Sequence, residues 1–253
     1  MASDIFLSIV IPSYNESQNI ARGVLDRTIE YLAKQDFSWE LILSDDGSTD
    51  GTSEHLDMFA KKNRNISVIH NTHRGKGPTV FAGMQIAKGK LRLFSDFDQA
   101  TPIEELEKLL PFFHRGYDVV IGSREVQGAK REREPIHRHI MGRVFNVAVK
   151  TVAIKGIQDT QCGFKMFTAE AVKTLFPLLY IYKPGAARSD SYTGAFDVEL
   201  LYIAEKLKMK IAEVPVYWSY MESIRVDPIK DSTRMFIDLL RIRLADFQGA
   251  YDR

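Results

Sequence analysis

The first half of the chain alternates short apolar runs with segments whose apolar residues recur at helical spacing. Five runs have the length and composition of buried strands: residues 7–12, 40–44, 66–70, 91–95 and 119–121. The segments between them place apolar residues on one helical face around residues 20–32, 56–60 and 106–113. Strands and helices that alternate in this way predict βαβ units. The expected fold is therefore α/β, with a mostly parallel central sheet and helices on both of its faces.

Four residues mark where helices are expected to begin. Ser17 and Thr52 are predicted N-caps, because their hydroxyl groups can accept hydrogen bonds from free backbone N–H groups. Pro78 and Pro102 suit the first turn of a helix, where the missing N–H would have had no partner. Each predicted start follows one of the predicted strands.

The pattern changes beyond about residue 125. A basic stretch with one proline leads into a helical pattern over residues 138–154. The later elements are predicted to be a strand at 164–167, a Gly/Ser-rich loop at 183–194, a helix at 196–207, a strand at 211–218 and a final helix at about 232–247. The sequence has no internal repeat, low-complexity tract or long linker. We therefore expect one domain over residues 1–253.

The final helix has an apolar side and basic residues elsewhere. The apolar residues are Met235, Phe236, Leu239, Leu240, Leu244 and Phe247. A basic amphipathic helix can lie in a membrane interface. An apolar stripe at helical spacing more commonly packs against the core. Packing against the core is therefore the expectation for this helix.

Composition narrows the function classes. The chain has 253 residues, of which 45% are hydrophobic, and 34 Lys and Arg nearly balance 33 Asp and Glu. With a net charge of +1, no global field favours nucleic acid, so any basic site is local. One cysteine, Cys162, excludes an internal disulfide framework and cysteine-built zinc sites. No apolar stretch approaches the roughly 18 residues of a membrane span, and the N-terminus lacks a basic leader. The expectation is a cytoplasmic protein.

Three predicted strands end in unusually polar segments. PSYNE follows the first strand, SDDGSTDGT the second and SDFDQATP the fourth. These residue types are also common in turns, which is the alternative explanation. Because the segments fall at the carboxyl edge of a parallel sheet, where ligands bind, we expect them to line a ligand site. The five carboxylates are Asp45, Asp46, Asp50, Asp96 and Asp98. They would repel one another unless a cation or hydrogen-bond donors offset their charge.

Asp96 and Asp98 form a D-x-D motif just past a predicted strand end. Two carboxylates one residue apart can both reach a ligand there. Mg²⁺ in proteins takes one or two carboxylates together with phosphate oxygens and water. The motif in this position therefore predicts a clamp for a metal ion and a diphosphate.

Other phosphate-binding motifs are absent or weaker. The sequence has neither G-x-G-x-x-G after the first strand nor G-x-x-x-x-G-K-[ST]. The RGKG segment at 74–77 could present backbone N–H groups and Lys76 to an anion, or could simply be a glycine turn. A phosphatase of the haloacid dehalogenase type also begins with D-x-D after a strand. Its motif requires Thr or Val at the fifth position, where this chain has Ala100.

Six motifs in this order and spacing resemble family 2 glycosyltransferases: IPSYNE, SDDGSTDGT, HRGKG, SDFDQATP, GSR at 122–124 and DTQCGFKMF at 159–167. Within that family the chain is most similar to the dolichyl- or polyprenyl-phosphate sugar synthases. DTQCGFK and FDVELL, at 196–201, favour the glucosyl type. The resemblance implies a glycosyltransferase A-type fold, a UDP-sugar donor rather than a GDP-sugar, and Mg²⁺ or Mn²⁺. It also implies inversion at the sugar, a nucleotide-sugar half at 1–124 and an acceptor half at 125–253.

The resemblance also assigns roles to single residues. Those expected around the donor's base and ribose are Pro12, Tyr14, Glu16, Asp45 and Asp46. Asp96 would face the ribose or sugar, and Asp98 would hold the metal with Asp96 nearby. Lys76 and Arg124 would contact the donor's sugar or phosphates. Asp159 stands at the position of an acceptor-side carboxylate. Asp98, Arg124 and Asp159 are thus the catalytic candidates.

The acceptor is expected on the basic side of the second half. Arg138 and Arg143 lie in an otherwise apolar helical pattern, and arginine there suits bidentate capture of a phosphate. Arg225 is a further phosphate candidate. Since this chain shows no span of its own, a lipid-phosphate acceptor would require contact with the cytosolic membrane face or with a membrane subunit.

Two other functions stay open from sequence alone. A lipid monophosphate is largely dianionic at pH 7 and needs no general base. A hydroxyl acceptor, such as a glycan, would need one, and Asp159 is the candidate. The chain could also be a non-catalytic subunit that binds a nucleotide sugar, although its metal carboxylates are present.

Overall fold

The computed structural model describes residues 4–132, 154, 156–182, 194–221 and 228–252, with side chains omitted at 228–232. Its main feature is a seven-stranded sheet in the order β3-β2-β1-β4-β7-β5-β8. The strands are β1 (Leu7–Ser13), β2 (Trp39–Asp45), β3 (Ile66–His70), β4 (Leu91–Ser95), β5 (Val119–Ser123), β7 (Phe164–Thr168) and β8 (Ile211–Pro215). All pairs are parallel except those of β7, which runs antiparallel between β4 and β5. The predicted mostly parallel sheet is confirmed.

Alternation along the strands builds one core on each face of the sheet. In β1, Val10 points to one face, whereas Ile9 and Ile11 point to the other. The strand is buried along its whole length because both faces are covered. This explains why the central strands are continuous apolar runs rather than alternating polar and apolar residues.

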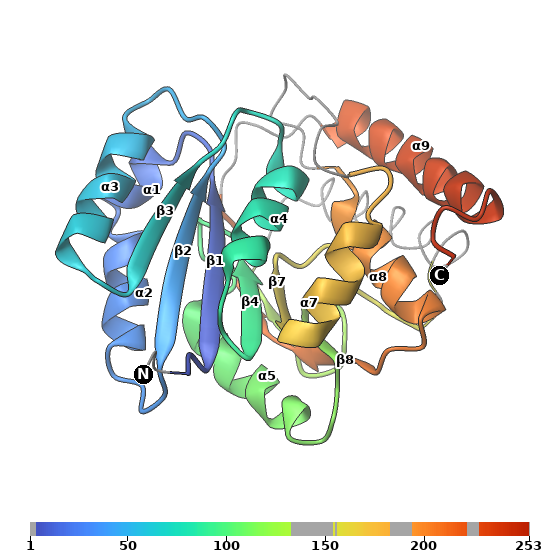
Figure 1. The fold of residues 1–253 in the computed structure, drawn as a ribbon, viewed down its shortest axis with the longest axis horizontal. Helices are drawn as coiled ribbons and strands as arrows, with labels where there is room; N and C mark the ends of the chain where they lie inside the picture. The colour runs from blue at the N-terminus through green and yellow to red at the C-terminus, as the bar shows by residue number, and fades with distance from the viewer. Residues whose placement is uncertain (1–3, 133–153, 155, 183–193, 222–227, 253) are drawn as a thin grey trace.

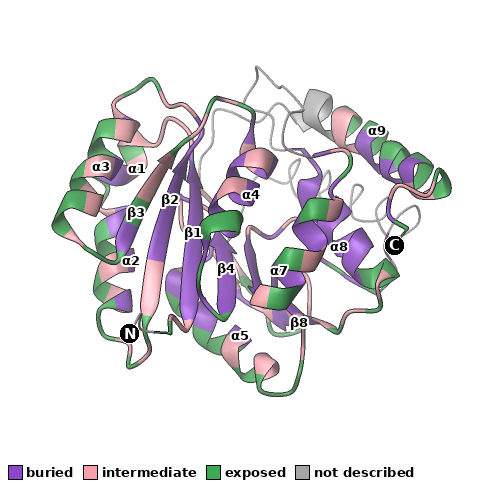
Figure 2. Ribbon diagram, viewed as in Figure 1, coloured by how far each residue is buried: buried purple, intermediate pink, exposed green. Residues whose placement is uncertain are grey.

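Helices cover both faces, as Figure 1 shows. The face of Ile9 and Ile11 carries α1 (Ser17–Ala21), α2 (Val24–Leu32), α3 (Thr52–Lys62), η1 (Ile103–Glu105) and α5 (Leu106–Phe113). The face of Val10 carries α4 (Lys76–Ile86), α7 (Ala169–Leu175), η2 (Phe176–Leu178), α8 (Phe196–Lys206) and α9 (Pro228–Phe247). α8 is buried over most of its length (Figure 2). Two of the buried residues of α8, Asp197 and Glu199, are charged.

Several predicted boundaries are corrected by the structure. Ser17 and Thr52 are the first helical residues, and the N-caps are Glu16 and Gly51. The Thr52 hydroxyl is instead engaged with Asp50 and accepts the N–H of Glu16. Pro78 lies in the first turn of α4 as predicted, whereas Pro102 lies just before η1.

Two more elements differ from the prediction. The expected strand at 211–218 is divided at Val216, whose N–H donates to the Ser123 carbonyl. After it, β9 (Tyr217–Trp218) pairs with β6 (Lys130–Arg131) in a separate small sheet. α7 has no counterpart among the predicted elements, and α9 begins at Pro228, earlier than expected. The helix expected at 138–154 lies almost entirely outside the described residues.

Among the described residues, no helix combines the length and the apolar character needed to cross a membrane.

Gly83 lets α4 approach β1 closely, and its replacement tests that contact. A Cβ at Gly83 would lie 2.4 Å from Cγ1 of buried Val10. Alanine would gain about 0.5–1 kcal/mol of helix propensity, but overpacking costs about 1–3 kcal/mol. We expect Gly83→Ala to lower the free energy of unfolding, measured by urea denaturation. In a Val10→Ala background the same change should become neutral or stabilising; an equal loss in both backgrounds would contradict this contact.

Candidate active site

The carboxyl ends of β1, β2 and β4 meet at one edge of the sheet. Ser13 pairs in register with Asp45, and Val10 pairs with Phe94, so Asp96 follows close to the end of β1. The three polar segments predicted to converge are therefore brought together by parallel pairing. What each carboxylate does there differs from residue to residue.

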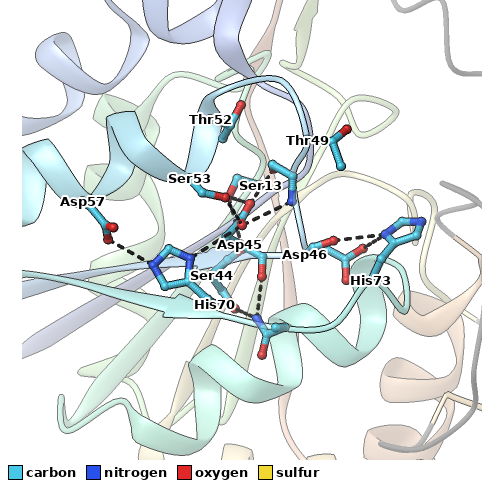
Figure 3. A network of polar contacts seen from close by, with 12 residues as sticks. Ser13, Ser44, Asp45, Asp46, Thr49, Thr52, Ser53, Asp57, His70 and His73 are labelled. Carbon is cyan, nitrogen blue, oxygen red and sulfur yellow. Dashed lines mark hydrogen bonds and ion pairs between the residues drawn. The ribbon is translucent and has the colours of Figure 1, made fainter.

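Asp45 holds the loop that follows β2. Its buried carboxylate accepts hydrogen bonds from the hydroxyl groups of Ser48, at 2.5 Å, and Ser53, at 2.6 Å, and lies 3.4 Å from the hydroxyl oxygen of Ser13 (Figure 3). His70 lies 3.7 Å away on β3. The carboxylate oxygens are thus engaged by side chains of this loop and of neighbouring strands. Direct contact between Asp45 and a donor stays a prediction.

Asp46 clamps the turn that leads into α4. Its carboxylate accepts the backbone N–H groups of Arg74, at 2.8 Å, and Gly75, at 2.9 Å. His73 Nδ1 lies 2.8 Å from the same carboxylate (Figure 3), and the His73 ring stacks on Tyr14 at 4.1 Å between centroids. This clamp fixes where α4 begins, and α4 begins with Lys76. Sequence reasoning missed His73, although it stands inside the HRGKG motif.

Asp50 joins two helix N-termini. It accepts the N–H of Ser17 in α1 and both the N–H and the hydroxyl of Thr52 in α3. Burial is the largest single effect and raises its pKa, but the hydrogen bonds from Thr52 and Ser17 together outweigh it and lower the pKa to about 2. Asp50 therefore has a capping role. Glu16 and Pro12, two of the predicted donor contacts, lie nearby: Glu16 accepts from the Asn19 amide, and Pro12 is buried within β1.

Asp96 is held between Lys76 and the backbone of Gly163. Lys76 Nζ lies 2.6 Å from Asp96 Oδ1, and the Asp96 N–H donates to the Gly163 carbonyl at 3.0 Å. A Cβ at Gly163 would lie only 1.9 Å from Asp96 Oδ2. The glycine of DTQCGFK is therefore required because the carboxylate of Asp96 occupies that space. Lys76 also lies over the Phe94 ring, 5.0 Å from its centroid.

Asp98 is a desolvated carboxylate next to Asp96. Burial and the negative charge of Asp96 raise its pKa to about 6, even though the Ala100 N–H donates to it and Lys76 lies nearby. The chain turns away immediately after it, at Gln99, which has a φ of 50°. Lys76 and the Ala100 N–H offset the negative charge of Asp96 and Asp98 only in part, so the pair is well suited to a divalent cation.

No other protein ligands for a metal complete the site within the described residues, which contain no group of three or more His, Cys, Asp or Glu side chains able to hold a metal ion. With no further ligand from the described residues, a cation held by Asp96 and Asp98 has room for oxygen ligands from a bound phosphate or from water. Mg²⁺ and Mn²⁺ accept such ligands. The D-x-D prediction fits the geometry, and metal binding itself stays a prediction.

A second ion pair lies buried beneath the first. Lys165 on β7 is fully buried and lies 3.0 Å from Asp197 on α8. Lys165 also donates to the Cys162 carbonyl, next to the glycine that receives Asp96. Burial raises the pKa of Asp197, although Lys165 and Lys76 act in the opposite direction. Sequence reasoning did not single out this pair.

Arg124 and Asp159 form a closed ion pair at the end of β5. Asp159 is fully buried and accepts Arg124 Nε at 2.7 Å, Nη2 at 2.9 Å and the Arg124 backbone N–H at 2.9 Å. Burial alone would raise the pKa of Asp159, but Arg124 lowers it to about 2. The Arg124 guanidinium also lies over the ring of Trp218, with Cζ 5.5 Å from the ring centroid. A carboxylate this acidic and this enclosed is poorly suited to be a general base.

Arg138, Arg143 and Arg225, the predicted contacts of an acceptor phosphate, lie outside the described residues.

The Arg124–Asp159 pair makes a testable contribution to stability. A folded-state pKa of about 2, against about 3.9 for an unperturbed Asp, corresponds to about 2–3 kcal/mol. Because the folded-state pKa is the lower one, this contribution is present above about pH 4 and is lost as the pH falls toward 2. We expect Asp159→Asn to reduce the free energy of unfolding by about 3–5 kcal/mol at pH 7, since Arg124 loses its partner.

Urea denaturation at pH 7, 4 and 3 measures this effect. The difference between wild type and Asp159→Asn should narrow as the pH falls below 4. Asp26→Asn, an exposed position in the first turn of α2, serves as the control and should show no such trend. A constant difference from pH 7 to pH 3 would contradict the lowered pKa.

Comparisons with known proteins agree with this geometry. The model of the family described as "Glycosyl transferase family 2" matches residues 8–176. A dolichyl-phosphate beta-glucosyltransferase of Dictyostelium discoideum is 35% identical over 262 residues, covering 98% of this chain and 77% of that protein. The Homo sapiens protein of the same name is 35% identical over 266 residues, covering 97% and 77%.

Solved structures share the fold. Glucosyl-3-phosphoglycerate synthase from Mycobacterium tuberculosis, in complex with UDP, aligns with a TM-score of 0.66 at 20% identity, covering 94% of this chain and 80% of that one. A mannosyltransferase from Pyrobaculum calidifontis, in complex with GDP-Man and Mn²⁺, aligns with a TM-score of 0.59 at 17% identity, covering 95% and 65%. These neighbours support the glycosyltransferase A-type fold expected from the motifs. Because the family model matches more than half of the chain and the relatives match nearly all of it, the chain belongs to glycosyl transferase family 2 and is a glycosyltransferase.

Proposed function

We propose that this protein transfers glucose from UDP-glucose to the phosphate of a dolichyl or other polyprenyl phosphate, with inversion at the sugar and with Mg²⁺ or Mn²⁺ as cofactor. The observation that carries the proposal is the similarity, over nearly the whole chain, to proteins named dolichyl-phosphate beta-glucosyltransferases. The arrangement of Asp96, Asp98 and Lys76 supports the donor half of the reaction. The geometry of Asp159 supports the acceptor half.

The donor is proposed to lie at the carboxyl edge of β1, β2 and β4. Asp98, with Asp96, would hold the metal ion, which when bound neutralises charge on the nucleoside diphosphate leaving group. Lys76 lies at the start of α4 with a backbone N–H terminus beside it, and would bind the same phosphates. UDP in one structural neighbour and Mn²⁺ in another are compatible with this arrangement.

The acceptor is proposed to be a phosphate because the site offers no free base at Asp159. A phosphate oxygen attacks C1 of glucose while the bond from C1 to the UDP oxygen breaks on the opposite face. The attacking phosphate monoester is already largely deprotonated at pH 7, so no proton has to be removed. Asp159, with a pKa of about 2 and three donors from Arg124, could not remove one efficiently. A hydroxyl acceptor is therefore the second candidate.

The donor proposal predicts that Asp98→Asn abolishes metal-dependent turnover. Removal of one charge-stabilising group from a desolvated site should lower kcat at least 100-fold, an order-of-magnitude expectation. Calorimetric titration with UDP, UDP-glucose, GDP and GDP-mannose, each with and without Mn²⁺, should show metal-dependent binding of the uridine series in wild type alone. Asp26→Asn should bind and react as wild type does. Near-normal activity of Asp98→Asn in a folded sample would remove the metal assignment.

The acceptor proposal predicts a selective effect of Arg138→Ala. If Arg138 binds the acceptor phosphate, the KM for dolichyl phosphate should rise roughly tenfold or more, the size of a lost charge-assisted contact. The KM for UDP-glucose should stay nearly constant. Arg64→Ala, at an exposed position after α3, is the matched control. A rise in the donor KM alone would assign Arg138 elsewhere, and transfer to a soluble glycan but not to dolichyl phosphate would favour the hydroxyl acceptor.

A further inference from the structure

α9 has two apolar faces, and only one of them is in the core. Leu239, Ile242 and Ala245 are buried against the rest of the protein. Phe236, Leu240, Leu244 and Phe247, which the sequence pattern placed on the same core-facing side as Leu239, are exposed. The expectation that this apolar stripe packs into the core is therefore wrong for these four residues.

Two hydrogen bonds, one buried and one partly buried, fix the rotation of α9 about its axis. Asp238 is almost fully buried and accepts the hydroxyl of Tyr182. About two helical turns further on, Asp246 accepts a hydrogen bond from the hydroxyl of Tyr202 and forms an ion pair with Lys206. Because both acids make these contacts on the inner side, a rotation that turned the exposed residues into the core would break the contacts and expose Leu239 and Ile242 to water.

We define the α9 outer face by its exposed large apolar side chains, Phe236, Ile237, Leu240, Leu244 and Phe247, which are between 43% and 89% exposed. At 3.6 residues per turn, all five fall within an arc of about 100° on the helix. Only three other large apolar residues in the described part of the chain are comparably exposed: Met58, Ile86 and Tyr180. Such a concentration on one helix marks a contact surface.

Arginine lines both edges of this face. On the same helical projection, Arg243 flanks the arc next to Phe236, and Arg241 flanks it beyond Ile237. Both side chains are more than half exposed, and each also contacts an acid on the inner side of α9: Arg241 donates to Asp238, and Arg243 Nη1 lies 3.9 Å from Asp246. No exposed side chain described on α9 is acidic. An apolar strip with cationic edges matches the surface of an anionic bilayer, because the strip enters the acyl boundary while the arginines reach lipid phosphates.

The position of α9 agrees with such a contact. In Figure 1, α9 lies at the same end of the molecule as the carboxyl ends of β1 and β2, where the candidate active site lies. A second copy of the chain is a poorer fit for the outer face. A twofold contact would bring the arginine edges of both copies together, and the acids that contact these arginines, Asp238 and Asp246, are only 2% and 22% exposed and so are poorly placed to pair with the other copy.

We propose that the α9 outer face docks in the surface of an anionic lipid bilayer and holds the active-site edge toward it. The proposal rests on the proposed function in one respect, since a lipid-phosphate acceptor would be presented from that bilayer. It makes the protein a peripheral membrane protein through a helix that lies in the interface and does not span it.

Vesicle binding of the full chain, without nucleotide or acceptor, tests the docking directly. Wild type should co-sediment with phosphatidylserine-containing vesicles more strongly than with pure phosphatidylcholine vesicles, and added salt should reduce the difference. Leu240→Gln/Leu244→Gln should weaken binding roughly tenfold or more, because two apolar side chains no longer enter the lipid. Met58→Gln/Ile86→Gln is the matched control: its two positions are 46% and 48% exposed, close to the 49% of Leu240, and its binding should equal that of wild type.

Three results would overturn the docking: no binding of wild type, equal loss in the control, or a wild-type dimer that the α9 variant dissociates while its vesicle binding persists. Circular dichroism checks the fold of the double variant, and Phe247→Gln alone, at the most exposed position, repeats the test if that variant unfolds.

Vesicle binding through α9 without glucosyl transfer would instead reject the proposed function. Transfer to a water-soluble, short-chain prenyl phosphate without vesicle binding would reject the docking alone.

Discussion

An alternating series of charges, partly buried at the sheet edge and fully buried beneath it, is the interaction on which the site depends. Asp96 is paired with Lys76, and Asp197 beneath them is paired with Lys165. Both lysines also lie near the Phe94 ring, at 5.0 and 5.8 Å from its centroid. Desolvation of isolated charges costs several kcal/mol each, so these groups are stable only as a set in which each charge faces an opposite one. β7 makes this possible, because its antiparallel insertion between β4 and β5 carries Lys165 under the site.

The carboxylates at the sheet edge coexist because they have different tasks. Asp45, Asp46 and Asp50 direct their oxygens to hydroxyl and backbone N–H groups of their own loop and of the neighbouring segments that begin α1 and α4. Those hydrogen bonds disperse negative charge and fix the loops that surround the site. Asp96 and Asp98 remain as the pair that Lys76 and the Ala100 N–H offset only in part among the described residues, and the raised pKa of Asp98 reflects that imbalance. The imbalance supports the proposed binding of a cation at this pair.

Local sequence patterns predicted much of the fold and of the candidate site. They could not predict contacts between residues that are far apart in the sequence. The first five strands and the D-x-D motif follow from apolar runs and from residue types at strand ends. The buried pair of Lys165 and Asp197 joins a strand to a helix 32 residues later, and neither residue has a neighbour in sequence that signals the other. The same holds for His73 and Tyr14. The Thr52 prediction failed for a related reason: a distant N–H, that of Glu16, uses the hydroxyl that a local pattern assigns to a cap.

The enclosure of Asp159 connects the fold to the choice of acceptor. An enzyme that must deprotonate a hydroxyl has to keep a carboxylate accessible and moderately basic, which is the reverse of what Arg124 does to Asp159. A phosphate acceptor removes that requirement and replaces it with a need for position and for compensation of negative charge. Positioning is also what α9 would provide if its outer face rests on lipid, because the approach of a membrane-held phosphate would then be set by the orientation of the whole protein. On this view the acids of the site mainly hold structure, and the reaction proposed here is limited by how well two anionic substrates are brought together.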